Sequence, residues 1–295
     1  MNLDFVVAAV YFSGWRVVRA LPEKFAYAIF ERLGAFSLRR NDSRIKRLRS
    51  NLERVAPEKN KEAMDELMVR AISSYMRYWC DTFRSPDWSK ARIVETVTVT
   101  REELLTEPMK DGRGVVVALP HAGNWDHAGS YFCAMGLPLV TVAERVKPEA
   151  LFEKFLEYRQ NIGMEVLALD SGSMATLMQR ARQGALIALV SDRDLSRGGV
   201  DVNFFGDTAR MPAGAALLAV RTSIPLITAY VSYNEKGIHI EFNSVEVPSS
   251  GSEQVRVART VQRCADLFAE GIAKHPQDWH MLQRIWIDSD FQERV

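Results

Sequence analysis

The feature that most constrains the fold is an alternation of short apolar runs and helical segments from about residue 94 onward. The runs GVVVALP, GLPLVTVAE, MEVLAL and ALIALVSD suit strands buried on both faces, and VETVTV is a further strand candidate. The segments REELLTEPM, LFEKFLEYRQ and MATLMQRAR lie between the runs and are predicted to be helices. This alternation is typical of an α/β protein, with a mostly parallel central sheet flanked by helices.

The two ends of the chain complete this pattern. PLITAYVSYNEKGIHIEFNSVEV predicts a hairpin that turns at Asn234–Gly237, and a long helix follows it. Residues 1 to about 90 are predicted to be helical, because KEAMDELMVRAISSYMRYW repeats apolar residues at helical spacing. We find no internal repeat and no low-complexity linker. The chain is therefore interpreted as a single domain over residues 1–295, with a helical N-terminal segment (1–90) and an α/β core (91–295).

Charge and cysteine content narrow the classes of function. The net charge of the 295 residues is only +1, so no overall positive field would recruit nucleic acid. The three cysteines are odd in number, far apart and not in metal-binding spacing, which favours neither a disulfide framework nor a zinc site. We expect no metal and a reducing compartment.

The N-terminal region raises the question of membrane contact. Its longest apolar run, residues 5–15, has about eleven residues, whereas spanning a bilayer needs about 20. Asp4 stands where a signal peptide would carry basic residues, so we expect the protein to stay in the cytoplasm. Residues 38–54 carry seven Arg or Lys and two acids, which fits either a solvated helix face or a surface that docks on anionic lipid. The aromatic and apolar residues within residues 5–15 favour the second interpretation, a surface that docks on lipid.

The stretch VVVALPHAGNWDHAGSYF contains the main candidate for chemistry. If residues 115–119 form a central strand, His121 lies at its carboxyl end, where ligands bind in open α/β sheets. A turn through Gly123 can fold Asp126 back onto the imidazole of His121. The carboxylate would then hold Nδ1–H and leave Nε2 free as a base.

A lone His-x4-Asp pair also fits an ordinary polar turn, so the residues alone leave both interpretations open. The sequence contains no G-x-S-x-G nucleophile context, no HExxH spacing and no Gly-rich phosphate loop. A catalytic His121 would therefore act directly on a bound hydroxyl group. The neighbouring His127 is predicted to be structural.

Several blocks together carry a family resemblance. HAGNWD resembles the H-x4-D block of the glycerolphosphate and lipid A acyltransferase superfamily. AERVKPEALFEKFLEYR, SDRDLSRGGVDVNFFG and IPLITAYV are similar to its second, third and fourth blocks, in the same order. The tail HPQDWHMLQRIW resembles the ending of the lipid A branch. In detail these segments look most like the actinobacterial phosphatidylinositol mannoside acyltransferases.

The resemblance implies an activity. Members of that family move a fatty acyl group, typically palmitoyl, from acyl-CoA to a mannose hydroxyl of phosphatidylinositol mannoside. The resemblance therefore implies His121 as the general base and Asp126 as its orienting partner. CoA is a good leaving group, so no acyl-enzyme is needed, and we expect no cofactor apart from the co-substrate acyl-CoA. The resemblance also implies a peripheral position on the anionic cytoplasmic face of the cell membrane.

The resemblance also suggests substrate-binding residues. Glu144 and Arg159 fall on the polar positions of the second block, which line the site. Asp192 falls where close relatives have glutamate, and we expect it to accept a hydrogen bond from a sugar hydroxyl. The oxyanion of the tetrahedral intermediate would be bound by Asn124 or by backbone N–H groups after His121. Basic residues that would meet CoA or inositol phosphates are Arg145, Lys147, Arg193, Arg197 and Arg210.

Two alternatives stay open from the sequence. The same pair of residues would serve a lysophospholipid or a lipid A precursor as acceptor, although SDRDLSRGG departs from the F-P-E-G-T-like block of lysophospholipid enzymes and favours a glycolipid. A protein of another class would keep the fold as a catalytically silent lipid-binding adaptor. The intact His121 and Asp126 argue against the adaptor.

Overall fold

The computed structural model describes residues 13–143, 149–170, 172–194, 196 and 198–287. Its centre is a seven-stranded sheet in which all neighbouring strands are parallel except one hairpin pair. The predicted α/β class with a mostly parallel sheet is therefore confirmed. In spatial order the strands are β1 (Val97–Thr100), β9 (Ile238–Val245), β8 (Leu226–Tyr233), β2 (Val115–Leu119), β5 (Leu186–Val190), β3 (Leu139–Ala143) and β4 (Glu165–Ala168).

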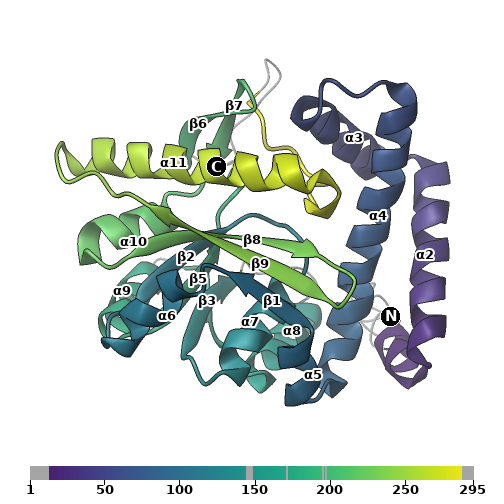
Figure 1. Ribbon diagram of the computed structural model, residues 1–295, viewed down its shortest axis with the longest axis horizontal. Coiled ribbons are helices and arrows are strands. Elements are labelled where there is room, and N and C mark those ends of the chain that lie inside the picture. The colour runs from purple at the N-terminus through teal and green to yellow at the C-terminus, as the bar shows by residue number, and fades with distance from the viewer. Residues whose placement is uncertain (1–12, 144–148, 171, 195, 197, 288–295) are drawn as a thin grey trace.

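Helices cover both faces of the sheet (Figure 1), which is why β2 has no exposed position. Val116 and Ala118 pack with the helices of one face, and Val115, Val117 and Leu119 pack with those of the other. The first face is covered by α9 (Ser173–Arg182), α10 (Gly214–Thr222) and α11 (Glu253–Lys274). The second face is covered by α5 (Lys90–Glu95), α6 (Glu103–Lys110), α7 (Trp125–Ala134) and α8 (Glu149–Asn161).

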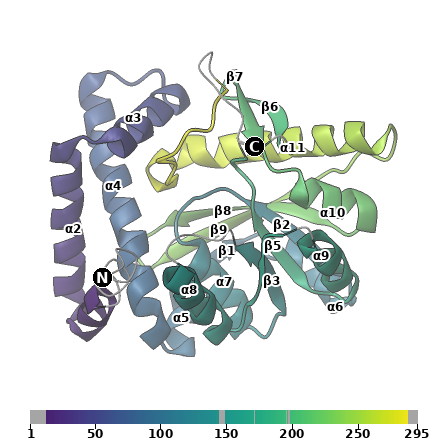
Figure 2. The same cartoon turned by 180° about the vertical axis from the view of Figure 1, so that it is seen from behind.

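The N-terminal helices form a separate layer beside the sheet, as both views show (Figures 1 and 2). This layer consists of residues 13–20, α2 (Glu23–Arg40), α3 (Ser43–Val55) and α4 (Lys61–Arg84). Tyr78 of α4 stacks on Trp125 with ring centroids 4.3 Å apart, and the guanidinium of Arg77 lies 4.1 Å from the ring centroid of Tyr233. Trp125 and Tyr233 follow or end β2 and β8, so α4 lies across the carboxyl edge of the sheet.

Two parts of the fold differ from the sequence prediction. The strand expected at VETVTV begins only at Val97, because Val94 and Glu95 end α5. The block SDRDLSRGGVDVNFFG ends in the first strand and the turn of an antiparallel hairpin that the sequence did not reveal, formed by β6 (Val200–Phe204) and β7 (Asp207–Met211). The predicted turn at Asn234–Gly237 is confirmed, with the Asn234 N–H 3.1 Å from the Gly237 carbonyl oxygen.

The tail returns to the carboxyl edge of the sheet after α11. A short 3-10 helix, η2 (Pro276–Asp278), leads into an extended stretch in which Trp279 forms a bridge with Ala122 and Trp286 forms one with Ala209. None of the helices within the described ranges is both long enough and apolar enough to cross a membrane.

Candidate active site

His121 directly follows Pro120 at the end of the central strand β2, as predicted. Strands β2 and β5 are parallel neighbours with Leu119 opposite Val190, so the residues after these two strands lie side by side. The Nδ1 atom of His121 is 2.6 Å from Oδ1 of Asp192, and the backbone N–H of His121 donates to Oδ2 at 3.0 Å. The His121 side chain is 37% exposed, whereas Asp192 is fully buried. Because Nδ1 is held by the carboxylate, Nε2 is the nitrogen available to a substrate.

Asp126 does not make the predicted contact with the imidazole. Its Oδ1 accepts a hydrogen bond from Nε of Arg159 at 2.9 Å, and its Oδ2 accepts one from the Tyr78 hydroxyl at 3.1 Å. The physical reason is that Asp126 lies in the first turn of α7 and points to the side where α8 and α4 pack. The contact inferred from the five-residue spacing is therefore wrong, and Asp192 occupies that place.

Asp192 is held as a carboxylate by its neighbours. Burial alone would raise its pKa, but the charge of His121, the two hydrogen bonds from that residue and the indole N–H of Trp279 hold the pKa below its usual value. The Trp279 Nε1 donates to Oδ2 at 3.0 Å. Asp192 thus faces His121 and Trp279 with no exposed surface, so the structure does not support the expected contact with a sugar hydroxyl. The shorter side chain nevertheless reaches Nδ1.

The proposed oxyanion donors are engaged in other contacts. The Ala122 N–H donates to the Pro120 carbonyl, and the Gly123 N–H donates to the Asp278 carbonyl, both at 2.8 Å. The Asn124 side chain caps α7 by accepting from the His127 N–H at 2.9 Å, and it also hydrogen-bonds the Asp81 carboxylate. The Ala122 and Gly123 N–H groups and the Asn124 side chain are therefore already hydrogen-bonded within the protein, so the structure does not support them as oxyanion donors.

The other predicted substrate-binding residues are only partly placed. Glu144, Arg145, Lys147 and Arg197 lie outside the described residues. Arg159 lies in α8 and binds Asp126, so the second-block position does line this edge of the sheet. Arg210 on β7 forms an ion pair with Asp201 at 2.6 Å, and Arg193 is half-buried beside Asp192. Contacts of Arg193 and Arg210 with phosphate stay predictions.

A narrow apolar cavity of about 80 Å³ lies next to this edge of the sheet. Its lining contains two charged residues, Asp126 and Arg159, together with Trp125. The rest of the lining consists of small and apolar side chains from the strands and from α7, among them Leu119, Ala188, Val190, Ala229, Phe132 and Met164. The cavity therefore lies beside Trp125 and Asp126 at the start of α7 and is bounded by strands of the sheet.

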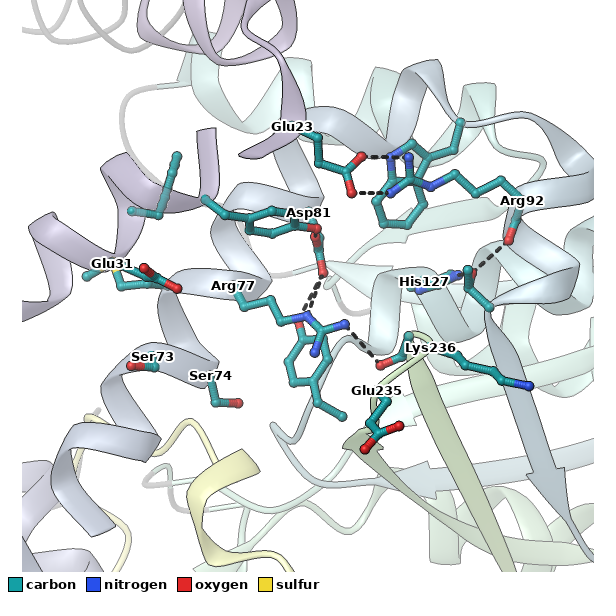
Figure 3. A pocket seen from close by; sticks show the side chains of 17 residues that line it. Glu23, Glu31, Ser73, Ser74, Arg77, Asp81, Arg92, His127, Glu235 and Lys236 are labelled. Carbon is teal, nitrogen blue, oxygen red and sulfur yellow. Dashed lines mark hydrogen bonds and ion pairs between the residues drawn. The ribbon is translucent and has the colours of Figure 1, made fainter. Parts of the chain in front are cut away.

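A second, polar cavity of about 600 Å³ lies between α2, α4 and the β8–β9 turn (Figure 3). Figure 3 shows the Glu23–Arg92 ion pair and the Arg77–Asp81 pair on its walls, with His127 beside Arg92. Burial lowers the pKa of His127 to about 4, so this imidazole is neutral at physiological pH. His127 thus lines a different cavity from the one beside Trp125, and its structural role stays a prediction.

Within the described ranges, no group of three or more His, Cys, Asp or Glu side chains could hold a metal ion. Sequence reasoning missed two contributors to the site, Tyr78 and Trp279. Trp279 had a signal in the tail HPQDWHMLQRIW, which matched a family ending without a known contact. Tyr78 gave no such signal, because a single tyrosine in a predicted amphipathic helix does not indicate a contact with a distant carboxylate.

The site and the fold together define a class of protein. A buried carboxylate behind a partly exposed histidine, at the carboxyl end of a central parallel strand, can activate a hydroxyl group for attack on an acyl donor. The profile of the family described as bacterial lipid A biosynthesis acyltransferase matches residues 3–287. The chain belongs to this family and is an acyltransferase.

Curated relatives indicate which group of acyltransferases within this family the chain resembles. The chain is 39% identical over 287 residues to a phosphatidylinositol mannoside acyltransferase of Mycolicibacterium smegmatis, covering 96% of this chain and 92% of the relative. It is 37% identical over 282 residues to the phosphatidylinositol mannoside acyltransferase of Mycobacterium tuberculosis, covering 94% of this chain and 87% of the relative. The predicted resemblance to that group is confirmed.

Proposed function

We propose that the chain transfers a fatty acyl group from acyl-CoA to a mannose hydroxyl of a phosphatidylinositol mannoside, with His121 as general base oriented by Asp192. The observation that carries the mechanism is the 2.6 Å contact between Nδ1 of His121 and the buried Asp192 carboxylate. The names of the relatives from two mycobacterial species support a phosphatidylinositol mannoside as the acceptor.

The chemistry follows from the pair. Nδ1–H donates to Asp192, so Nε2 carries the free lone pair and takes the proton of the mannose hydroxyl as its oxygen attacks the thioester carbonyl. The tetrahedral intermediate then collapses: the C–S bond breaks, and the imidazolium returns its proton to the CoA thiolate. Asp192 stabilises the imidazolium in between. Proton transfer by a positioned base contributes roughly 10²- to 10⁴-fold to the rate.

The apolar cavity beside Trp125 is the proposed place for the acyl chain. At about 80 Å³ it is smaller than the roughly 300–1,000 Å³ of most ligand sites, so a long chain must widen it. Met164 is the side chain best placed to move. Its Cε lies over Gly129, where an added Cβ would be only 2.2 Å away. We infer that the flexible Met164 is displaced when an acyl chain enters.

We also propose a peripheral membrane position, with α2 as the lipid-facing element. Phe25, Ile29, Leu33 and Phe36 lie on one face of α2 and are 65%, 38%, 48% and 61% exposed. Arg39 and Arg40 follow in its last turn. An apolar face with adjacent basic residues suits a helix that lies in the surface of an anionic bilayer.

This surface differs from the one predicted from the sequence. Residues 1–12 lie outside the described chain, and Trp15 is only 5% exposed because it packs against Phe83. In the basic run, Arg49 pairs with Asp65 and Arg54 pairs with Asp207. Part of the positive charge of this run is therefore neutralised by acidic residues of the protein itself.

Vesicle binding tests the membrane proposal. Replacing Phe25, Leu33 and Phe36 by Ser should abolish co-sedimentation with vesicles that contain phosphatidylinositol. Val255→Ser is a control, because Val255 is 42% exposed in the first turn of α11, and α11 begins on the side of the molecule away from α2 (Figure 1). Equal binding by the triple variant and the control would remove α2 from the account.

Acyl transfer tests the function. Purified protein and His121→Ala would be incubated with labelled palmitoyl-CoA and phosphatidylinositol mono- or dimannoside, lysophosphatidate or buffer. Label on the mannosides with wild-type protein, reduced by about 10²-fold or more in the variant, is the expected result. Label on lysophosphatidate alone would keep the mechanism and replace the acceptor. The absence of both transfer and hydrolysis would favour the catalytically silent adaptor.

A further inference from the structure

Three consecutive residues of the tail contact the site from its buried side. We call Asp278, Trp279 and His280 the strap. The Trp279 indole N–H donates to Oδ2 of Asp192 at 3.0 Å. The Asp278 carbonyl accepts the N–H of Gly123 at 2.8 Å, and the N–H of His280 donates to the carbonyl of His121 at 2.8 Å. The strap thus contacts both members of the pair and the loop between β2 and α7.

The strap is itself fixed by the rest of the protein. The Ser74 hydroxyl of α4 donates to Oδ1 of Asp278 at 2.7 Å and lies 2.9 Å from Nε2 of His280. The N–H of Tyr233 on β8 donates to the other oxygen of Asp278 at 3.1 Å. All three strap residues are buried, at 2%, 0% and 7% exposure. A segment held from α4 and β8 can therefore hold His121 and Asp192 in turn.

We propose that the strap is a positioning device for the proposed base, with Trp279 as its main positioning residue. Oδ2 of Asp192 is shared by the indole N–H and the backbone N–H of His121, which leaves Oδ1 for Nδ1. Two donors on one oxygen fix the plane of the carboxylate, and the plane fixes the direction of the imidazole. Hydrogen bonds from a neutral donor to a buried carboxylate are among the stronger ones in proteins.

A purely structural role for Trp279 is the competing explanation, and a neighbouring residue separates the two. The Trp279 ring packs near Phe204 and Trp286, with centroids 6.1 and 6.0 Å away. Trp286 is also buried in this cluster, at 2% exposure, but its indole N–H donates to the Phe204 carbonyl at 3.0 Å. Trp286→Phe therefore removes the same atoms and one buried hydrogen bond without touching Asp192.

The test compares wild type, Trp279→Phe and Trp286→Phe in two ways. The first is the low-field proton resonance of the His121 Nδ1–H, assigned by its loss in His121→Gln and observed without substrate. The second is kcat and KM for acyl transfer. For Trp279→Phe we expect loss or faster exchange of the resonance and a kcat lower by roughly 10- to 100-fold at unchanged KM, as misplacement of a reacting group produces. Trp286→Phe should keep both. Equal behaviour of the two variants would overturn the proposal.

Ser74→Ala provides the result if Trp279→Phe fails to fold. It removes one hydroxyl that holds the strap, so the resonance should broaden and kcat should fall several-fold, by less than the direct change; an unaltered resonance and kcat would overturn the proposal. The kinetic readout rests on the proposed function, whereas the resonance does not. If wild type transfers no acyl group but Trp279→Phe loses the resonance, the function fails and the strap stands. If wild type is active and Trp279→Phe matches Trp286→Phe, the strap fails alone.

Discussion

Two buried carboxylates lie at the same edge of the sheet and differ in what they hold. Asp192 has no exposed surface and binds a histidine that is 37% exposed. Asp126 is 4% exposed and binds Arg159, which is 20% exposed, together with the hydroxyl of Tyr78. The first pair has one partner that can reach a substrate, because the His121 side chain is partly exposed. The second is a closed pair that joins α7 to α8 and α4.

The difference shows that position in the sheet decides the pairing, whereas spacing along the chain does not. Asp126 is five residues from His121, yet it lies in the first turn of α7, which points its side chain toward Arg159 and Tyr78. Asp192 is 71 residues away, but it follows β5, the parallel neighbour of β2. Residues after adjacent parallel strands meet at the same edge, so the more distant carboxylate is the closer one in space.

The largest expected effect is on the histidine of the first pair. His121→Gln keeps a polar side chain but removes the base, and we expect kcat to fall by about 10²- to 10⁴-fold. The measurement is acyl transfer from palmitoyl-CoA with phosphatidylinositol dimannoside. His239→Gln is the control, because His239 lies on β9 beside Thr98 and outside the site. Activity within a few-fold of wild type in His121→Gln would remove the imidazole from the mechanism.

The second effect belongs to the closed pair. Asp126→Asn leaves Arg159 buried without its counter-charge, and breaking a buried ion pair typically costs about 3–5 kcal/mol. We expect a loss in this range in the free energy of unfolding, measured by urea denaturation. Asp65→Asn, which breaks exposed pairs with Arg49 and Lys61, should leave the stability nearly unchanged. Equal midpoints for the two variants would contradict the account of Asp126 as a structural link.

The amount of the molecule that sequence could predict follows from the same contrast. Apolar runs gave the strands of the central sheet and turn chemistry gave the Asn234–Gly237 hairpin, because both are local signals. His121 was found because a polar residue directly follows a buried strand. The order of the strands is not local, so the sequence placed neither Asp192 beside His121 nor Trp279 beside Asp192. The β6–β7 hairpin was missed because its turn, Phe205–Gly206, lacks the usual Asn-Gly or Asp-Gly pattern.

The pH dependence of stability tests the buried histidine of the same stretch, His127. Burial lowers the pKa of His127 to about 4, below the ordinary value near 6.5 that it has in the unfolded chain. Between these values the unfolded chain binds one more proton than the native one, so stability falls as pH falls, by about 1.4 kcal/mol per pH unit for this group. His127→Asn should reduce the slope of unfolding free energy between pH 6.5 and 4.5. An unchanged slope would mean that His127 is charged in the folded state.

The smallest expected effect concerns the cavity beside the closed pair. In Gly129→Ala the new methyl group would clash with Met164, which lines the same apolar cavity beside Trp125. We expect a reduction of a few-fold in kcat/KM for palmitoyl-CoA and a smaller one for a short-chain acyl-CoA. Ala134→Ser, at the end of α7, is the control. Gly136→Ala is less suitable, because the φ of Gly136 is +84° and an alanine there would be strained although the position is open. Equal losses with both donors would place the acyl chain elsewhere.

The measurement that tests the central claim most directly is kcat for Asp192→Asn beside Asp126→Asn, both corrected for the folded fraction. The account predicts that Asp192→Asn loses about 10²- to 10⁴-fold, because the imidazole loses its orienting carboxylate. Folded Asp126→Asn should lose at least tenfold less, since its partner is Arg159 and not the base. The reverse order of the two losses would contradict the assignment of Asp192 as the partner of His121.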